Sequence, residues 1–195
     1  NAEIKAATGC TISGPAAEAE QIGTLDVLLA EGNTVRIGSH VAKVLEVPAH
    51  TAGHIAYHLA EDDLIFVGDT MFAMGCGRLF EGTPGQMLAS LDLLSTLPDR
   101  TQVSCGHEYT ENNARFAAAA EPDNADRDAL MQQVMRQRAN GEPSLPSDIG
   151  SEKACNPFLR LDDPEMLPGL NLRFANPPKT RLERFTVLRA WKDVF

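Results

Sequence analysis

Short apolar stretches separated by turn residues dominate the first half of the chain. The runs at residues 34–37, 41–47, 55–59 and 64–67 are rich in β-branched and other apolar residues, and a Gly-Ser-His turn and a Glu-Asp-Asp turn connect neighbouring runs. Such runs predict strands. Because the connections are too short for a crossover, these four strands are predicted to form an antiparallel meander. A fifth strand is predicted at residues 102–105.

Helical periodicity begins near residue 83. The segment TPGQ at 83–86 has the pattern of a capping box with proline at the first helical position. The apolar residues of the predicted helix fall on one face, suited to packing on a sheet: Met87, Leu88, Leu91 and Leu94. Further helices are predicted at residues 110–120, 124–139 and 180–195.

Prolines change the character of the chain after residue 141. They recur between residues 143 and 178 and predict extended pieces rather than helices there. Strands followed by helices indicate an α/β sandwich with a helical C-terminal region. The sequence predicts a division into residues 1–115 and 116–195.

Composition narrows the class of protein. A chain of 195 residues with 43% hydrophobic side chains can bury a substantial core. A formal net charge of -10 argues against nucleic acid or an anionic membrane as partner, so an anionic substrate would need a local basic pocket. The chain shows neither a spanning segment nor a secretory signal. Four widely spaced cysteines indicate reduced thiols and a cytoplasmic location: Cys10, Cys76, Cys105 and Cys155.

Three candidate metal ligands each follow a predicted strand. They are His50, Asp69 and His107. Two imidazoles and a carboxylate suit zinc, iron or manganese. Taken singly, a histidine after a strand is more often a surface residue, and an aspartate before threonine is more often a turn residue. The residue types alone leave both interpretations open.

Six short motifs, in order along the chain, change that balance. They are PAHTAGH, FVGDTMF, CGR, CGHEYT, NPFLR and an R-x-x-K in the last helix. Together they resemble the glyoxalase II family of the metallo-β-lactamase superfamily. The resemblance implies a metallo-β-lactamase-like αββα sandwich followed by a helical, glutathione-binding C-terminal domain. The family's first motif, T-H-x-H-x-D-H, is not found, which implies an N-terminally truncated sandwich.

The resemblance also implies a role for individual residues. His50 is similar to a ligand of one metal and His107 to a ligand of a second, whereas Asp69 is similar to the carboxylate that bridges both. Two divalent ions are implied, zinc first, with iron or manganese as alternatives. His54 is expected to be a hydrogen-bonding neighbour rather than a ligand. The implied substrate-binding residues are Arg78, Tyr109, Arg189 and Lys192.

The implied reaction is hydrolysis of S-D-lactoylglutathione, and of related 2-hydroxyacyl-glutathione thioesters, by a metal-bound hydroxide during methylglyoxal detoxification. No nucleophilic serine or cysteine is required, and a monomer is expected. Without the first motif the chain as given is expected to bind metal poorly and to be nearly inactive. Two alternatives remain: a persulfide dioxygenase-like enzyme, and a metal-free glutathione-binding module.

Overall fold

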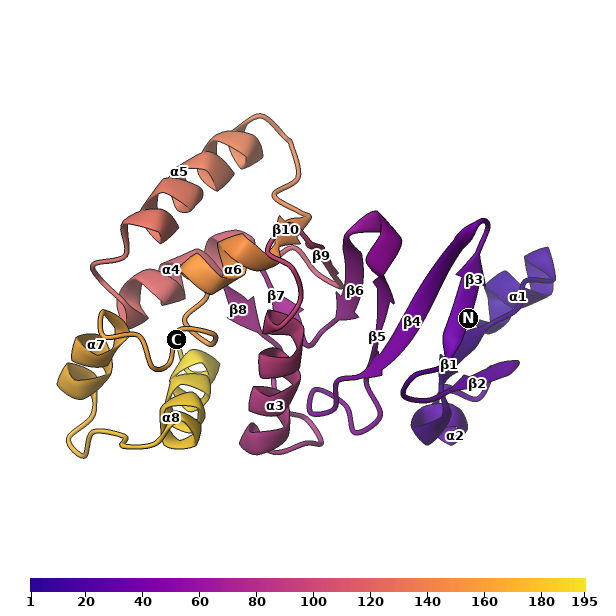
Figure 1. Ribbon diagram of the computed structural model, residues 1–195, viewed down its shortest axis with the longest axis horizontal. Coiled ribbons are helices and arrows are strands. Elements are labelled where there is room, and N and C mark those ends of the chain that lie inside the picture. The colour runs from indigo at the N-terminus through magenta and orange to yellow at the C-terminus, as the bar shows by residue number, and fades with distance from the viewer.

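A six-stranded mixed sheet forms the centre of the computed structural model, which describes residues 1–195 (Figure 1). The strand order is β10-β9-β6-β5-β4-β3. The strand bounds are β3 Thr34–Ile37, β4 His40–Glu46, β5 Ile55–Leu59, β6 Leu64–Gly68, β9 Gln102–Cys105 and β10 Ser147–Asp148. β3 to β6 pair antiparallel in sequence order, which confirms the predicted meander. β9 is parallel to β6, because the chain returns through helix α3 (Pro84–Ser95).

Helix α3 covers one face of the sheet and begins as predicted. Thr83 and Gln86 form the capping box, and Pro84 lies at the first helical position. The apolar face of α3 packs on the inward residues of β4, β5, β6 and β9 in one buried cluster. The two sets of inward side chains are Met87, Leu88, Leu91 and Leu94 from the helix, and Leu45, Ala56, Ile65, Val67 and Val103 from the strands.

The cap of α3 supports a first prediction. Thr83→Ala should lower the free energy of unfolding by about 1 kcal/mol, because the Gln86 amide loses its acceptor. Thr96→Ala is the control at the other end of the same helix, where the hydroxyl is exposed and only donates to the Leu93 carbonyl. Urea unfolding of both variants checks the prediction, and equal losses in the two would contradict it.

The opposite face of the sheet is covered only in part. The N-terminal elements α1 (Ala2–Thr8), β1 (Ser13–Pro15), η1 (Ala16–Glu18), α2 (Ala19–Ile22) and β2 (Val27–Leu29) lie at the end of the molecule away from the C-terminal helices (Figure 1). β1 and β2 form a separate parallel pair. Phe66, on this face of β6, remains 43% exposed. Residues 2–29 thus form short helices and strands that do not belong to the six-stranded sheet.

The C-terminal half is helical and contains two helices that the prolines concealed. α4 (Thr110–Ala120), α5 (Ala125–Ala139) and α8 (Arg181–Asp193) confirm the predicted helices within two residues at either end. The extended chain predicted between them is wrong, because α6 (Ile149–Cys155) and α7 (Met166–Arg173) form there. Asp148 caps α6 through the Ser151 amide. Pro168 lies in the first turn of α7, where backbone amides have no intrahelical acceptor, so a proline there breaks no hydrogen bond of the helix.

Candidate active site

The three candidate ligands converge at one end of the sheet. His50 follows β4, Asp69 follows β6 directly, and His107 follows β9. Both rings approach the same carboxylate oxygen: Oδ2 of Asp69 lies 3.3 Å from Nε2 of His50 and 3.6 Å from Nε2 of His107. The chain therefore places one carboxylate between two imidazoles.

The carboxylate of Asp69 has the features of a metal ligand. Its Oδ1 is buried without a hydrogen-bond partner. A buried acceptor without a donor costs roughly 1 to 3 kcal/mol, and a cation would remove that cost. The space for Oδ1 exists because residue 106 is glycine, since a Cβ there would lie 2.5 Å from it. The residues present therefore fit divalent metal ions.

The ring of His50 is oriented for coordination through Nε2. Its Nδ1 lies 2.9 Å from the carbonyl oxygen of Arg78, and because a carbonyl only accepts, Nδ1 carries the proton. Nε2 then keeps its lone pair on the side of Asp69, an arrangement common to histidine ligands of metals. The ring of His107 is half-exposed and stacks on Tyr109 at 5.0 Å between ring centroids.

His54 supports Asp69 through the backbone. Its Nε2 accepts the amide proton of Asp69 at 3.1 Å, and its Nδ1 lies 3.3 Å from the hydroxyl of Thr51. Burial, followed by the neighbouring His50, lowers the pKa of His54 and keeps the ring neutral. The structure thus places His54 beside the site as a hydrogen-bonding neighbour, in agreement with the sequence analysis.

A cavity of about 550 Å³ opens at this carboxylate. All seven residues expected to bind metal or substrate line it: His50, Asp69, Arg78, His107, Tyr109, Arg189 and Lys192. They come from both halves of the chain, because α8 packs beside α3 and brings its last turns to the rim. The exposed ring of Phe80 also lines the cavity and contacts the ring of His50.

The three cations of the cavity differ in their surroundings. Arg189 is only 4% exposed, and its guanidinium donates to the Cys76 carbonyl at 2.8 Å and to Asp193 at 3.1 Å. Arg78 is largely exposed, 3.8 Å from Asp193. Burial, followed by the charge of Arg189, lowers the pKa of Lys192 to about 8. Arg78 and Lys192 are therefore the cations less committed to backbone contacts.

Other reactive side chains are poor candidates. Burial raises the pKa of the Cys76 thiol to about 11, so this thiol is not a nucleophile at neutral pH. His40 pairs with Asp62 at the surface. The one further acidic cluster consists of Glu121, Asp163 and Glu165. The guanidinium of Arg160 contacts all three carboxylates, so a protein cation already occupies that cluster.

Sequence reasoning missed two glycines of the site. A Cβ at Gly106 would meet Oδ1 of Asp69. A Cβ at Gly77 would lie 1.9 Å from the carbonyl oxygen of Asp69. Both glycines stand inside motifs already noticed, CGR and CGHEYT. Close backbone approach is a usual reason for glycine beside a ligand, and this signal was available without the structure.

Comparison with known proteins agrees with this geometry. A family model described as "Hydroxyacylglutathione hydrolase C-terminus" matches residues 108–195, and one described as "Metallo-beta-lactamase superfamily" matches residues 9–107. The hydroxyacylglutathione hydrolase of Maricaulis maris is 45% identical over the whole chain, which covers 75% of that protein. That of Pseudomonas aeruginosa is 47% identical with the same coverage.

Solved structures share the fold. ETHE1 from Myxococcus xanthus superposes with a TM-score of 0.60 at 26% identity, over 98% of this chain and 70% of that one. A metallo-beta-lactamase from Staphylococcus aureus gives a TM-score of 0.56 at 18% identity, over 97% of this chain and 52% of that one, a likeness of fold alone. Sequence identity, the two family matches and the fold agree, so the chain belongs to the hydroxyacylglutathione hydrolase family within the metallo-β-lactamase superfamily.

Proposed function

We propose that the protein hydrolyses S-D-lactoylglutathione and related 2-hydroxyacyl-glutathione thioesters to glutathione and a 2-hydroxy acid. The observation that carries the proposal is the single cavity in which Asp69, between two imidazoles, faces cationic side chains of the C-terminal helix. Its named relatives are thioester hydrolases, and their names favour this reaction over a persulfide dioxygenase. The unpartnered buried oxygen of Asp69 favours it over a metal-free binding module.

Divalent metal binding is a property of the superfamily, and His50, Asp69 and His107 would hold the ions here. Two ions are proposed, zinc first and iron or manganese as alternatives. When bound, such ions lower the pKa of water enough to supply hydroxide at neutral pH. The chain itself orients the ligands: Nδ1 of His50 is held by the Arg78 carbonyl, and the backbone of Asp69 is held by His54.

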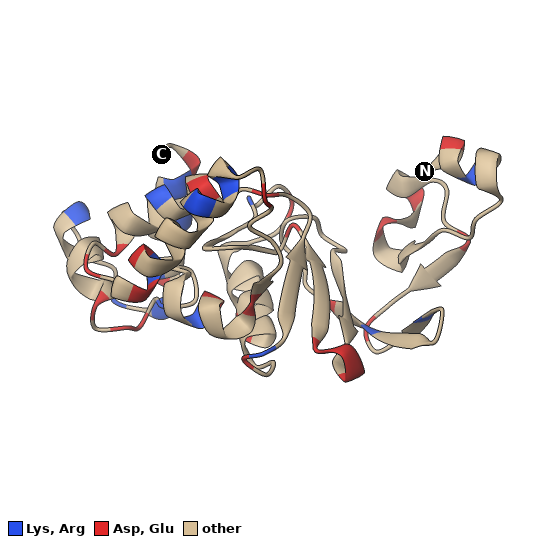
Figure 2. Ribbon diagram, turned by 90° about the horizontal axis from the view of Figure 1, so that it is seen from above, with Lys and Arg blue, Asp and Glu red and all other residues tan.

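The glutathione moiety would bind through the cations and Tyr109. Lysine and arginine residues are concentrated in the C-terminal helices, where acidic residues also lie, although the chain as a whole has a net charge of -10 (Figure 2). A tripeptide with carboxylates would therefore meet a locally favourable field at this cavity, which Arg78, Arg189 and Lys192 line. The hydroxyl of Tyr109 would add a hydrogen bond, and Arg78 and Lys192 would contact carboxylates.

No helix of the chain is both long enough and apolar enough to cross a bilayer. A small-molecule substrate agrees with the size of the cavity. The monomeric state, the cytoplasmic location and the division near residue 115 remain predictions. The largest buried cluster includes side chains from both sides of that division, among them Ile65 and Phe185.

The test of the proposed function uses the protein with any residues that its gene encodes before Asn1. The purified protein is assayed for bound metal by emission spectroscopy and for loss of thioester absorbance with S-D-lactoylglutathione. We expect turnover that a chelator removes and added zinc restores. A metal-loaded protein that leaves this thioester intact would refute the proposal.

The role of Lys192 gives a second prediction. Lys192→Ala should raise KM for the glutathione thioester by about 10-fold or more and change kcat less, because the lost charged hydrogen bond lies remote from the reacting carbonyl. Lys192 is cationic below its pKa of about 8, so its contribution to KM should disappear as the pH rises through that value. Steady-state kinetics between pH 6.5 and about 9 measure both effects.

Lys153→Ala is the matched control, since Lys153 pairs with Asp99 on the surface and lies outside the cavity. Arg189→Ala should also raise KM, but with a loss of stability, because the Cys76 carbonyl loses a buried donor. An unchanged KM in the Lys192 variant would show that Lys192 is a solvated surface charge and does not contact the substrate.

A further inference from the structure

A fully buried carboxylate lies outside the proposed chemistry. Glu152, on α6, has no exposed surface. Its Oε2 accepts the amide proton of Met74 at 2.9 Å and an amide proton from Nδ2 of Asn156 at 2.8 Å, and its Oε1 accepts from the hydroxyl of Ser147. Burial of a carboxylate is costly unless donors compensate for lost water, and three donors do so here.

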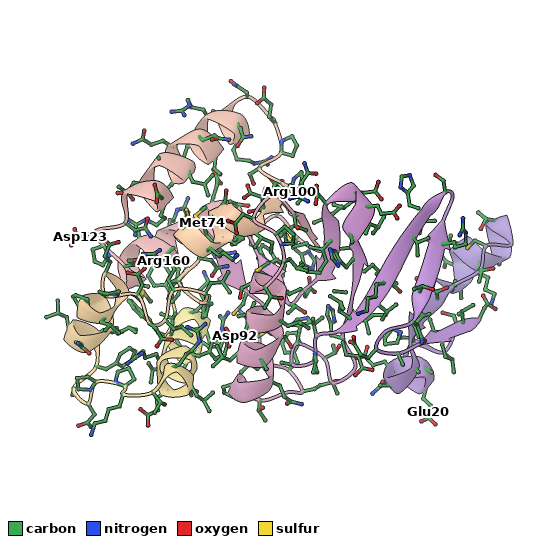
Figure 3. The ribbon with its side chains drawn as sticks, viewed as in Figure 1. Glu20, Met74, Asp92, Arg100, Asp123 and Arg160 are labelled. Atoms are coloured by element: carbon green, nitrogen blue, oxygen red, sulfur yellow. The ribbon has the colours of Figure 1, made fainter.

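Through its hydrogen bond to the Met74 amide, Glu152 binds the turn of a small hairpin. β7 (Met71–Phe72) and β8 (Gly75–Cys76) pair antiparallel, and Met74 lies in the turn beside α6 (Figure 3). Met74 has a φ of 55°, in the left-handed region that residues other than glycine rarely adopt. Such a conformation persists where surrounding contacts fix it, and the hydrogen bond from the Met74 amide to Glu152 is one of these.

Two asparagines hold the rest of the turn. Nδ2 of Asn156 donates to the carbonyls of residues 72 and 75, and Nδ2 of Asn113 donates to the carbonyl of residue 73. Four consecutive residues of the hairpin, 72 to 75, therefore each have a backbone group bound by a side chain from the C-terminal half. Asn156, the first residue of the NPFLR motif, is part of this arrangement and is fully buried.

The hairpin connects the two sides of the proposed site. Asp69 stands immediately before it, and Arg78 stands just after it. The side chain of Phe72 lines the cavity and contacts the ring of Tyr109 edge-on, at 5.2 Å between centroids. Gly77 packs so closely on the Asp69 carbonyl that no side chain fits between them. Movement of the turn would therefore displace both the cavity wall and the candidate metal ligand.

We propose that Glu152 is a positioning residue for this cavity, whose ionised carboxylate fixes the Met74 turn and thereby the placement of Phe72, Asp69 and Arg78. Any consequence of this placement for turnover would rest on the proposed function, whereas the effect of Glu152 on the turn does not. Glu152 touches neither substrate nor the candidate metal ligands.

The ionisation of Glu152 falls in an accessible range. Burial raises its pKa to about 7, against the lowering effect of its bonds to Ser147, Asn156 and Met74, and the charge of Asp148 raises it further. Cys105 and Cys155 are the other titratable groups that respond to its charge, and burial keeps both thiols neutral at this pH. A protonated carboxyl accepts weaker hydrogen bonds than a carboxylate, so the turn should loosen as the pH falls through about 7.

The contribution of Glu152 to the free energy of unfolding should change with pH in the direction opposite to the protection of the turn. Because the pKa of Glu152 is higher in the folded protein than the ordinary value of 4.5, the folded state binds this proton more tightly than the unfolded chain. The stabilisation from protonation is full below about 4.5 and is lost as the pH rises through about 7. Between pH 8 and 6 the contribution of Glu152 to the free energy of unfolding should therefore increase while the turn loses hydrogen-bond protection.

The experiment is amide hydrogen exchange of the full chain by NMR, with the Met74 amide as reporter and the Ile65 amide in the central sheet as internal reference. In the wild-type protein the protection of Met74, corrected for intrinsic exchange, should fall about 3-fold or more between pH 8 and 6. Glu152→Gln keeps the reach of the side chain but cannot ionise, so this pH dependence should vanish. Glu152→Asp retracts the carboxylate and should lower Met74 protection about 10-fold with Ile65 unchanged.

Lys153→Ala is the matched control on the same helix, because that side chain pairs with Asp99 at the surface and does not contact the turn, so protection of Met74 at pH 8 should persist. The same pH dependence of Met74 protection in wild type and Glu152→Gln would overturn the proposal. So would an equal loss at Ile65 and Met74 in a folded Glu152→Asp protein. If Glu152→Asp does not fold, the comparison of wild type with Glu152→Gln decides. These measurements need neither metal nor thioester, so failure of the proposed function leaves them interpretable.

Discussion

Replacing Asp69 with alanine is expected to remove bound divalent metal and to lower kcat/KM for S-D-lactoylglutathione by about 1,000-fold or more, since the proposed metal site would lose its one carboxylate. The physical reason is that the two imidazoles approach only this carboxylate, at 3.3 and 3.6 Å from Oδ2. Metal content by emission spectroscopy and initial rates on the same preparation test the two effects together.

Stability separates loss of the site from loss of the fold. The metal-free Asp69→Ala protein should melt no lower than the metal-free wild type, because the variant also removes a buried oxygen without a partner. Asp99→Ala is the control, since that exposed carboxylate pairs with Lys153 away from the cavity. Full metal content and near-normal kcat in Asp69→Ala would contradict the assignment.

A single methyl group at position 106 should have the next largest effect. In Gly106→Ala the new Cβ would lie 2.5 Å from Oδ1 of Asp69, well inside van der Waals contact, and the carboxylate is the group able to move. We expect the affinity for divalent metal to fall by about 10- to 100-fold, the range typical when the support of a metal ligand is lost. Isothermal titration with zinc on the metal-free protein measures the change.

Two other glycines provide the comparison. Gly85→Ala adds a methyl group whose nearest neighbours lie 3.9 Å away, so metal affinity and stability should stay near wild type. Gly77→Ala places its Cβ 1.9 Å from the Asp69 carbonyl, which is backbone and cannot turn aside. That variant should lose metal affinity, and its free energy of unfolding should also fall by about 3 kcal/mol. A Gly106→Ala protein with wild-type zinc affinity would show that Oδ1 is no ligand.

Five of the six strands of the central sheet were predictable because each carries its own signal, whereas β10 has two residues in the proline-rich stretch and no pattern of its own. Between residues 34 and 68 short apolar runs alternate with tight turns, and local pairing then fixes the order. The elements before residue 34 were not predictable in this way. β1 and β2 have three residues each, and α1 buries none of its side chains, so no periodic pattern marks them. α6 and α7 were hidden by prolines that lie outside a helix or in its first turn.

The site residues were predictable from motifs, but their supports were not. His50, Asp69 and His107 stand beside strands that the sequence already indicated. The hydrogen bond between Glu152 and the Met74 amide joins residues that are 78 positions apart in the sequence. The hydrogen bond from Asn156 to the Gly75 carbonyl joins residues that are 81 positions apart. No local pattern encodes contacts over such distances, and the prolines around Glu152 predicted extended chain rather than a helix with a buried carboxylate. The burial of Arg189 was equally invisible, because charged residues at helical spacing usually face solvent.

The backbone contacts at residues 72 to 76 bear on recombination between relatives. The candidate metal ligands all lie within residues 9–107, whereas the candidate substrate-binding residues Tyr109, Arg189 and Lys192 lie within residues 108–195. A chimera that joins these two segments from different relatives therefore looks like a simple way to change which thioester is bound. Yet Asn113, Glu152, Asn156 and Arg189 of the second segment bind the main chain of the first. An incoming segment without equivalents of these four side chains would leave the hairpin unanchored, and the transplanted pocket would then face a displaced Asp69.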